Sequence, residues 1–186
     1  MLQHVLVVDD FVSVCDGIAA LIEKAEGIGK VYTAYHATEA LKIVRSERIH
    51  AALIDARMPD TNGIALISLL QTEYPTIKLI GMTSYDDDTV VEVLRTGVPG
   101  FLLKRSTDRA EINLCLREVL AGRTYYTAEV QSRLNQNGYN LLKPIIQFTK
   151  REMEMLPLLC AGQSTKQIAD HLGLKEYTIE DYRKEL

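Results

Sequence analysis

The sequence lacks the features of a membrane, secreted or disulfide-stabilised protein. None of its apolar runs approaches the length of a membrane-spanning helix, and residues 1–8 are too short for a signal peptide because two aspartates follow them directly. It has only three cysteines, Cys15, Cys115 and Cys160, which are far apart and lie within apolar patterns. We therefore expect reduced core thiols in a cytoplasmic protein, without a disulfide or a cysteine metal site.

The chain also has little net charge. Its formal net charge is −4 over 186 residues, so the composition predicts no general attraction to nucleic acid or to an anionic membrane. A content of 47% hydrophobic and 25% charged residues is typical of a globular protein with a buried core. The length fits one domain of ordinary size plus a smaller one, or a single large domain.

Short apolar runs alternate with helical periodicity through the first two thirds of the chain. The pattern predicts strands at residues 5–8, 31–34, 51–54, 77–82 and 98–103, and helices near 12–24, 36–48, 63–74, 86–95 and 107–121. Strict alternation of strand and helix indicates a doubly wound α/β fold, a five-stranded parallel sheet with helices on both faces. We expect the strand order 2-1-3-4-5, with its switch point between the first and third strands.

Polar residues follow four of the five predicted strands at their carboxyl ends: Asp9 and Asp10, Asp55, Thr83, and Lys104. In this strand order they converge on one mouth, where open α/β sheets bind ligands. Three neighbouring carboxylates repel one another unless a cation holds them, and Mg²⁺ prefers such oxygen ligands. A hydroxyl and an ammonium suit phosphate oxygens. The alternative interpretation is a structural Asp–Lys ion pair in an α/β fold of another function.

Residues 1 to about 122 resemble the receiver domain of bacterial two-component response regulators. The matching motifs are VVDD at 7–10, DARMPDTNG at 55–63, MTS at 82–84 and FLLK at 101–104. The resemblance implies a flavodoxin-like fold in which Asp55 takes a phosphoryl group from a sensor histidine kinase. It also implies a Mg²⁺ site and no enzymatic activity beyond self-phosphorylation and slow self-dephosphorylation.

The resemblance also implies a role for the other residues of these motifs. Asp9, Asp10 and Asp55 would hold Mg²⁺ together with the main-chain carbonyl of Arg57. Thr83 and Lys104 would contact the phosphoryl oxygens, and Thr83 and Phe101 would act as the switch.

Two positions depart from common receiver sequences. Phe101 lacks the polar tip of the tyrosine or histidine found in many receivers, and Lys104 is followed by Arg105 rather than proline. We expect phosphorylation to draw Thr83 toward Asp55 and to let Phe101 pack inward. That movement would reshape the face made by the fourth helix, fifth strand and fifth helix, and would favour a homodimer.

The second part of the chain has the pattern of a small helical domain. Residues 123–147 are predicted to be a linker with a short helix near 125–135, and residues 148–186 to be a helix-turn-helix. Thr149 to Glu152 and Ser164 to Gln167 form capping boxes, and Gly173 marks the turn. From the pattern alone, an ordinary pair of antiparallel helices remains the alternative.

The stretch FTKREMEMLPLLCAGQSTKQIADHLGLKEYTIEDYR is similar to the DNA-binding domain of NarL/LuxR-type regulators. The resemblance implies a transcription regulator whose helix from Thr178 onward enters the major groove of promoter DNA. Thr178, Arg183 and Lys184 are the candidate DNA contacts.

Several residues weaken this second expectation. Pro157 falls inside a predicted helix, at a cost of about 3 kcal/mol unless the helix kinks. Lys175 replaces the usual Ser or Thr cap, a loss of about 1 kcal/mol. Glu180 and Asp181 place negative charge on the recognition helix, and the sequence ends at Leu186, before a fourth helix. We therefore expect weak or no DNA binding by this 186-residue chain.

These observations favour a response regulator that controls transcription through its helix-turn-helix. The alternative is a signalling adaptor whose receiver binds protein partners while the tail no longer binds DNA. A Mg²⁺-dependent phosphatase of another type is disfavoured, because the motifs offer no second base and no acid for a leaving group.

Overall fold

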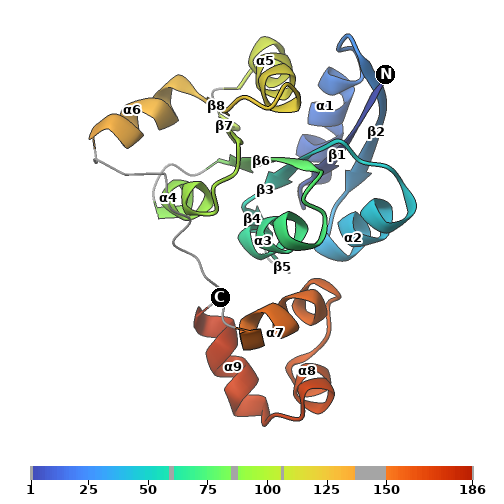
Figure 1. The fold of residues 1–186 in the computed structure, drawn as a ribbon, viewed down its shortest axis with the longest axis vertical. Coiled ribbons are helices and arrows are strands. Elements are labelled where there is room, and N and C mark those ends of the chain that lie inside the picture. The colour runs from blue at the N-terminus through green and yellow to red at the C-terminus, as the bar shows by residue number, and fades with distance from the viewer. Residues whose placement is uncertain (1, 59–60, 85–87, 106, 137–149, 186) are drawn as a thin grey trace.

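A computed structural model describes residues 2–58, 61–84, 88–105, 107–136 and 150–185 (Figure 1). The elements are β1 (Gln3–Val8), α1 (Val12–Ile22), β2 (Ile28–Ala34), α2 (Ala37–Ser46), β3 (Ala51–Asp55), β4 (Arg57–Met58), β5 (Thr61–Asn62), α3 (Gly63–Glu73), β6 (Lys78–Thr83), α4 (Asp88–Arg95), β7 (Gly100–Leu103), α5 (Arg109–Leu120), β8 (Tyr125–Tyr126), α6 (Ala128–Gln136), α7 (Lys150–Cys160), α8 (Thr165–Leu172) and α9 (Glu176–Glu185).

The central sheet is parallel and six-stranded, in the order β2-β1-β3-β6-β7-β8. The doubly wound fold and the order of its first five strands are confirmed. The sixth strand, β8, was not predicted, because two residues are too few to show a periodicity. β4 and β5 form a separate two-stranded hairpin after β3.

Two hydrophobic cores cover the two faces of this sheet. Alternate residues of β1 supply them: Val5 and Val7 pack with α1 and α5, whereas Leu6 and Val8 pack with α2, α3 and α4. In Figure 1, α1 and α5 accordingly lie on one side of the sheet, and α2, α3 and α4 on the other. Because both faces are covered, every residue of β3 is buried, as its continuous apolar run predicts.

The sheet continues into the stretch predicted to be a linker. The backbone N–H of Tyr125 donates to the carbonyl of Pro99 at 2.8 Å, and that of Thr127 to the carbonyl of Phe101 at 3.2 Å. α6 follows, and its Val130 is fully buried in the same core as Phe101. Residues 137–147 of the predicted linker lie outside the described residues.

Helices α7, α8 and α9 form a small domain with its own core of Met155, Ile168, Ala169 and Ile179. Of the two predicted capping boxes, the one at the start of α8 is confirmed: the Ser164 and Gln167 side chains each bond the other's backbone N–H. The other begins at Thr149, which lies outside the described residues. Gly173 ends α8 with φ of 65°, a left-handed conformation that glycine adopts without strain.

Two details of this domain differ from expectation. α7 runs through Pro157 as one helix, and the carbonyl of Pro157 accepts from Ala161 N–H at 2.9 Å. α9 begins at Glu176 rather than at Thr178, because the Lys175 carbonyl already accepts from Thr178 N–H at 3.0 Å. The recognition helix is therefore longer at its start than predicted.

The three cysteines are free and buried, as predicted. Burial raises the pKa of the Cys15 thiol to about 11 and that of Cys115 and Cys160 to about 12. A raised pKa disfavours the thiolate, which is the reactive form of cysteine. Among the described helices, none combines the length and hydropathy that crossing a bilayer requires.

Candidate functional site

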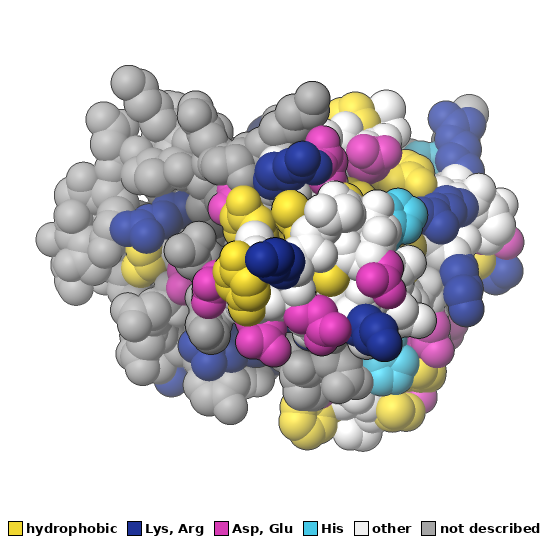
Figure 2. All heavy atoms as spheres, turned by 90° about the horizontal axis from the view of Figure 1, so that it is seen from below, with side chains coloured by type: hydrophobic (Ala, Val, Ile, Leu, Met, Phe, Trp, Pro, Cys, Tyr) yellow, Lys and Arg dark blue, Asp and Glu magenta, His cyan; other side chains and the backbone are white. Residues whose placement is uncertain are grey.

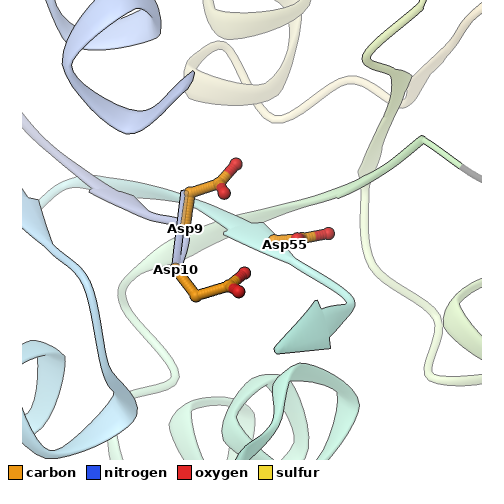
Figure 3. Close-up of side chains that lie close together, drawn as sticks. All are labelled: Asp9, Asp10 and Asp55. Atoms are coloured by element: carbon orange, nitrogen blue, oxygen red, sulfur yellow. The ribbon is translucent and has the colours of Figure 1, made fainter. Parts of the chain in front are cut away.

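Three carboxylates converge at the carboxyl edge of the sheet. Asp9 and Asp10 follow β1, and Asp55 ends the neighbouring strand β3, where Val8 pairs with Ile54. Each carboxylate offers an oxygen within 4.8 Å of the others, and Figure 3 shows the three side chains projecting from the two adjacent strand ends. The structure therefore brings the predicted acidic residues together.

Lys104 joins two of these carboxylates. Its Nζ lies 2.6 Å from Asp9 Oδ2 and 2.8 Å from Asp55 Oδ2, and all three side chains are buried or nearly so. Asp9 Oδ1 also accepts the backbone N–H of Phe11 at 3.0 Å. The ammonium thus neutralises part of the acidic cluster from the end of β7.

The Asp55 carboxyl is more basic than an ordinary aspartate. Burial raises its pKa, and the hydrogen bond and charge of Lys104 together with the Arg57 N–H oppose that rise. The neighbouring charge of Asp9 raises the pKa further. A basic carboxylate held beside a cation suits nucleophilic attack on an electrophilic phosphorus.

Asp10 supplies the observation that fits a metal ion. Its Oδ1 is shielded from solvent, and no described group donates a hydrogen bond to it. A buried carboxylate oxygen without a donor is costly unless a cation binds it. Together with Asp9 and Asp55 it provides the hard oxygen ligands that Mg²⁺ prefers, so the donor set fits this ion.

The loop after Asp55 folds closely over the strand end. A Cβ on Gly63 would lie only 1.8 Å from the carbonyl oxygen of Asp55, so no other residue fits there without moving the backbone. Asn62 caps α3 by accepting the N–H of Ile64 at 3.0 Å. Asn62 and Gly63 thus place the start of α3 directly against the acidic site.

The two residues expected to act as the switch, Thr83 and Phe101, both lie in buried positions of neighbouring strands. Thr83 is the last residue of β6, is fully buried, and its carbonyl accepts the Lys104 N–H at 2.9 Å. Phe101 is also fully buried. Gly81 leaves room for its ring, because a Cβ there would lie 3.2 Å from it, and Val130 of α6 belongs to the same hydrophobic core.

One contact of the site was not predicted. Arg57 Nε donates to Thr89 Oγ1 at 2.7 Å, which ties the loop after β3 to the first turn of α4. Both residues line a cleft of about 860 Å³ that also contains Asp10, Asp55 and Lys104. No motif relates positions so far apart in the chain, so sequence reasoning had no signal for this pair.

The structure places the three candidate DNA contacts on α9 in different settings. Thr178 is half-buried in the first turn, and Arg183 Nη2 donates to the carbonyl of Gln163 at 2.9 Å. Lys184 lies in α9, but its side chain is outside the described residues. Glu180 and Asp181 are exposed, and Figure 2, seen from the side of this domain, shows acidic and basic side chains intermixed rather than a basic surface.

Comparison with known families and proteins agrees with this architecture. Residues 5–116 match the response regulator receiver domain, and residues 147–186 match the luxR family of bacterial regulatory proteins. The oxygen regulatory protein NreC of Staphylococcus aureus (strain JH9) is 28% identical, over 97% of this chain and 88% of its own length.

Solved structures share the fold. The response regulator RcsB of Salmonella typhimurium is 23% identical with a TM-score of 0.65, over 99% of this chain and 89% of that one. A structure of an RcsB–DNA complex is 22% identical with a TM-score of 0.67, over 100% and 90% of the two chains. A CheY-like receiver domain from Methanospirillum hungatei JF-1 is 26% identical with a TM-score of 0.59, over 66% and 96%.

The receiver match spans more than half of the chain, and the acidic site lies within it. The chain therefore belongs to the two-component response regulators, with a receiver domain followed by a regulatory domain of the luxR family.

Proposed function

We propose that this response regulator accepts a phosphoryl group on Asp55 from a sensor histidine kinase and controls transcription through its C-terminal helix-turn-helix. The observation that carries the first half is the position of Asp55, a basic carboxylate within ion-pair distance of Lys104 and close to Asp9 and Asp10. No comparable acidic cluster occurs elsewhere among the described residues.

In this proposal Asp9, Asp10, Asp55 and the main-chain carbonyl of Arg57 would hold Mg²⁺, which would supply positive charge beside the transferring phosphoryl group. An Asp55 oxygen forms the new bond to phosphorus as the bond to the donor's nitrogen or oxygen breaks, and the donor keeps that electron pair. The chain's chemistry is limited to this transfer and to slow loss of the phosphoryl group to water.

Lys104 and Thr83 then act on the product. Once Asp55 carries the phosphoryl group, the Lys104 ammonium can pair with a phosphoryl oxygen instead of the carboxylate it holds in this structure. The Thr83 hydroxyl, at the end of β6, donates to another oxygen. We propose that the change passes through Thr83 to Phe101, that it reshapes the face made by α4, β7 and α5, and that it favours a homodimer.

The proposed DNA-binding part is residues 148–186, after the receiver of residues 1–122 and a linker of 123–147. RcsB, which shares this fold, has been solved in complex with DNA, and this supports the same use of the tail here. Thr178, Arg183 and Lys184 on α9 are the proposed contacts, and Arg183 can reach DNA after releasing the carbonyl of Gln163.

Acetyl phosphate with Mg²⁺ tests the phosphoacceptor. The chain should gain the mass of one phosphoryl group, and Asp55→Asn should not, whereas Thr83→Ala should still be modified at Asp55. Stoichiometric modification of the Asp55→Asn variant would show that the site is elsewhere.

One observation favours the adaptor function as a second candidate. The exposed face of α9 carries Glu180 and Asp181, and its Arg183 is engaged within the domain. A mobility-shift titration against the DNA upstream of its own gene separates the two functions, with Asp55→Asn as the unphosphorylated control. Sequence-specific retardation supports the transcription regulator, and its absence in a chain extended beyond Leu186 supports the adaptor.

A further inference from the structure

The first eight residues of helix α3 have no exposed or charged side. All eight residues from 63 to 70 are buried, and none of them is charged. A helix that packs one face on a sheet normally exposes a polar opposite face, and a helix that is hydrophobic all round is covered all round. The sheet accounts for only one side of α3, so a second element must cover its outer face.

The outer face can be identified from helix geometry. Leu66, Ile67 and Leu70 are fully buried and, at 3.6 residues per turn, share one face of α3, which we assign to the sheet. At 3.6 residues per turn, Ala65 and Ser68 lie on the opposite side, yet they are only 5% and 8% exposed. Thr72 continues this outer row by one turn and is exposed. The cover therefore extends over the first two turns and stops before the third.

The covering element is α7 of the C-terminal domain, which packs along α3 and α2 and lies directly beneath them in Figure 1. Its Cys160 is fully buried and belongs to the receiver's core cluster, whereas the core of its own domain contains Met155 instead. Leu156, one turn before Cys160, is also fully buried. Just beyond α7, a Cβ on Gly162 would lie 3.7 Å from Thr38 Cγ2 at the start of α2.

We propose that the outer face of α3, formed by Ala65, Ser68 and the flanking Leu69, is the receiver's docking surface for α7 of the same chain. This surface carries no charge, and the short side chains of Ala65 and Ser68 allow a second helix to approach closely. On α7, the apolar residues Leu156 and Cys160 lie one turn apart and face it in this proposal. This inference does not depend on whether Asp55 is the phosphoacceptor.

The docking surface has two consequences for the domain that it holds. α3 begins at Gly63, against the carbonyl of Asp55, so the docked domain rests on the helix that starts at the acidic site. Docking also leaves α9 uncovered, because Tyr177 is 61% exposed and Glu176 and Glu180 are exposed. The surface therefore fixes the position of the regulatory domain without masking its recognition helix.

Alkylation of Cys160 by iodoacetamide, followed residue by residue with mass spectrometry on the full chain, tests the proposal. In the wild-type chain Cys160 should be protected. Ser68→Lys places a long charged side chain where α7 sits and should raise the Cys160 rate about tenfold or more, by opening the contact. Thr72→Lys is the matched control, one turn along the same face but exposed, and should leave the rate unchanged. Cys15 and Cys115 report the receiver's own fold and should stay protected throughout.

Several results would overturn the proposal. Rapid labelling of Cys160 in the wild type, or equal protection in Ser68→Lys, would show that α3 does not shield this thiol. Protection that disappears on dilution would assign the surface to a second copy of the chain. If Ser68→Lys also exposes Cys15 and Cys115, the receiver itself has opened, and the Cys160 labelling rate is then measured in Ala65→Lys instead. If both variants expose Cys15 and Cys115, Ala65 and Ser68 belong to the receiver's own core and do not form a docking surface.

Discussion

Replacing Lys104 by Met removes the cation that pairs with Asp9 and Asp55 while keeping most of its aliphatic stem. Lys104 Nζ lies 2.6 Å from Asp9 Oδ2 and 2.8 Å from Asp55 Oδ2, with side-chain exposures of 10%, 0% and 6% for the three residues. Without the ammonium, two buried carboxylates lose their partner and lie beside that of Asp10. Removing one partner of a buried ion pair typically costs about 3–5 kcal/mol.

The expected loss of stability lies at the lower end of that range, about 3 kcal/mol, because Lys104 retains some contact with water. For a chain of this length each kcal/mol shifts the midpoint by about 2–4 °C, so the variant should melt about 6–12 °C lower. Mg²⁺ should reverse much of this loss, because a dication at the three carboxylates replaces the missing charge and stabilises the state that it binds.

Thermal and urea unfolding, with and without MgCl₂, measure both effects. Lys78→Met is the matched control, since Lys78 lies at the amino end of β6, at the opposite edge of the sheet. Two results would refute the reasoning. One is a loss below about 1 kcal/mol in the absence of Mg²⁺, the value of an exposed pair. The other is a response to Mg²⁺ no larger in Lys104→Met than in the wild-type chain.

Three further predictions concern other parts of the receiver. Asp10→Ala should weaken Mg²⁺ or Mn²⁺ binding in a titration without destabilising the metal-free fold, because it removes a carboxylate whose Oδ1 has no donor among the described groups; unchanged affinity would contradict the assignment. Gly63→Ala should lower the free energy of unfolding by about 3 kcal/mol or more, since its Cβ would overlap the Asp55 carbonyl, and a near-neutral effect in urea unfolding would contradict this. The pKa of His50 is lowered by burial, by Arg48 and by His4, so its contribution to stability is present above about pH 6.5 and is lost as the pH falls. His50→Gln should therefore flatten the fall in urea midpoint between about pH 7.5 and 5.5, and an unchanged slope would count against it.

Much of the receiver fold follows from local sequence patterns. The run at 51–54 is apolar at every position because helices cover both faces of β3, and strict alternation of strand and helix leaves few topologies. The sequence did not predict β8, because its two tyrosines form a strand by pairing with β7, and no local sequence pattern indicates that contact. Similarly, α9 begins at Glu176, directly after the expected cap Lys175 and two residues before Thr178, and its first backbone bond goes to the Lys175 carbonyl.

The acidic site was predictable to a large extent because parallel strands deliver their terminal residues to one edge. Asp9, Asp55 and Lys104 meet there within ion-pair distance, as their strand positions imply. The sequence did not show which residues surround Phe101, since its core includes Val130 from the later helix α6. The Arg57–Thr89 hydrogen bond could not be predicted either, since it joins two residues 32 positions apart in the sequence.

The short strand β8 determines where this chain can be cut. A fragment that stops at Gly122 would leave the carbonyls of Pro99, just before β7, and of Phe101 in β7 without the donors that Tyr125 and Thr127 provide. It would also remove Val130 from the core that contains Phe101. An unpaired strand edge of that kind is a template for pairing with another copy. A dimer formed by such a fragment would report the cut and not a response to phosphorylation. A receiver fragment that keeps α6, through Gln136, retains the pairing of β8 with β7 and is the form in which self-association can be interpreted.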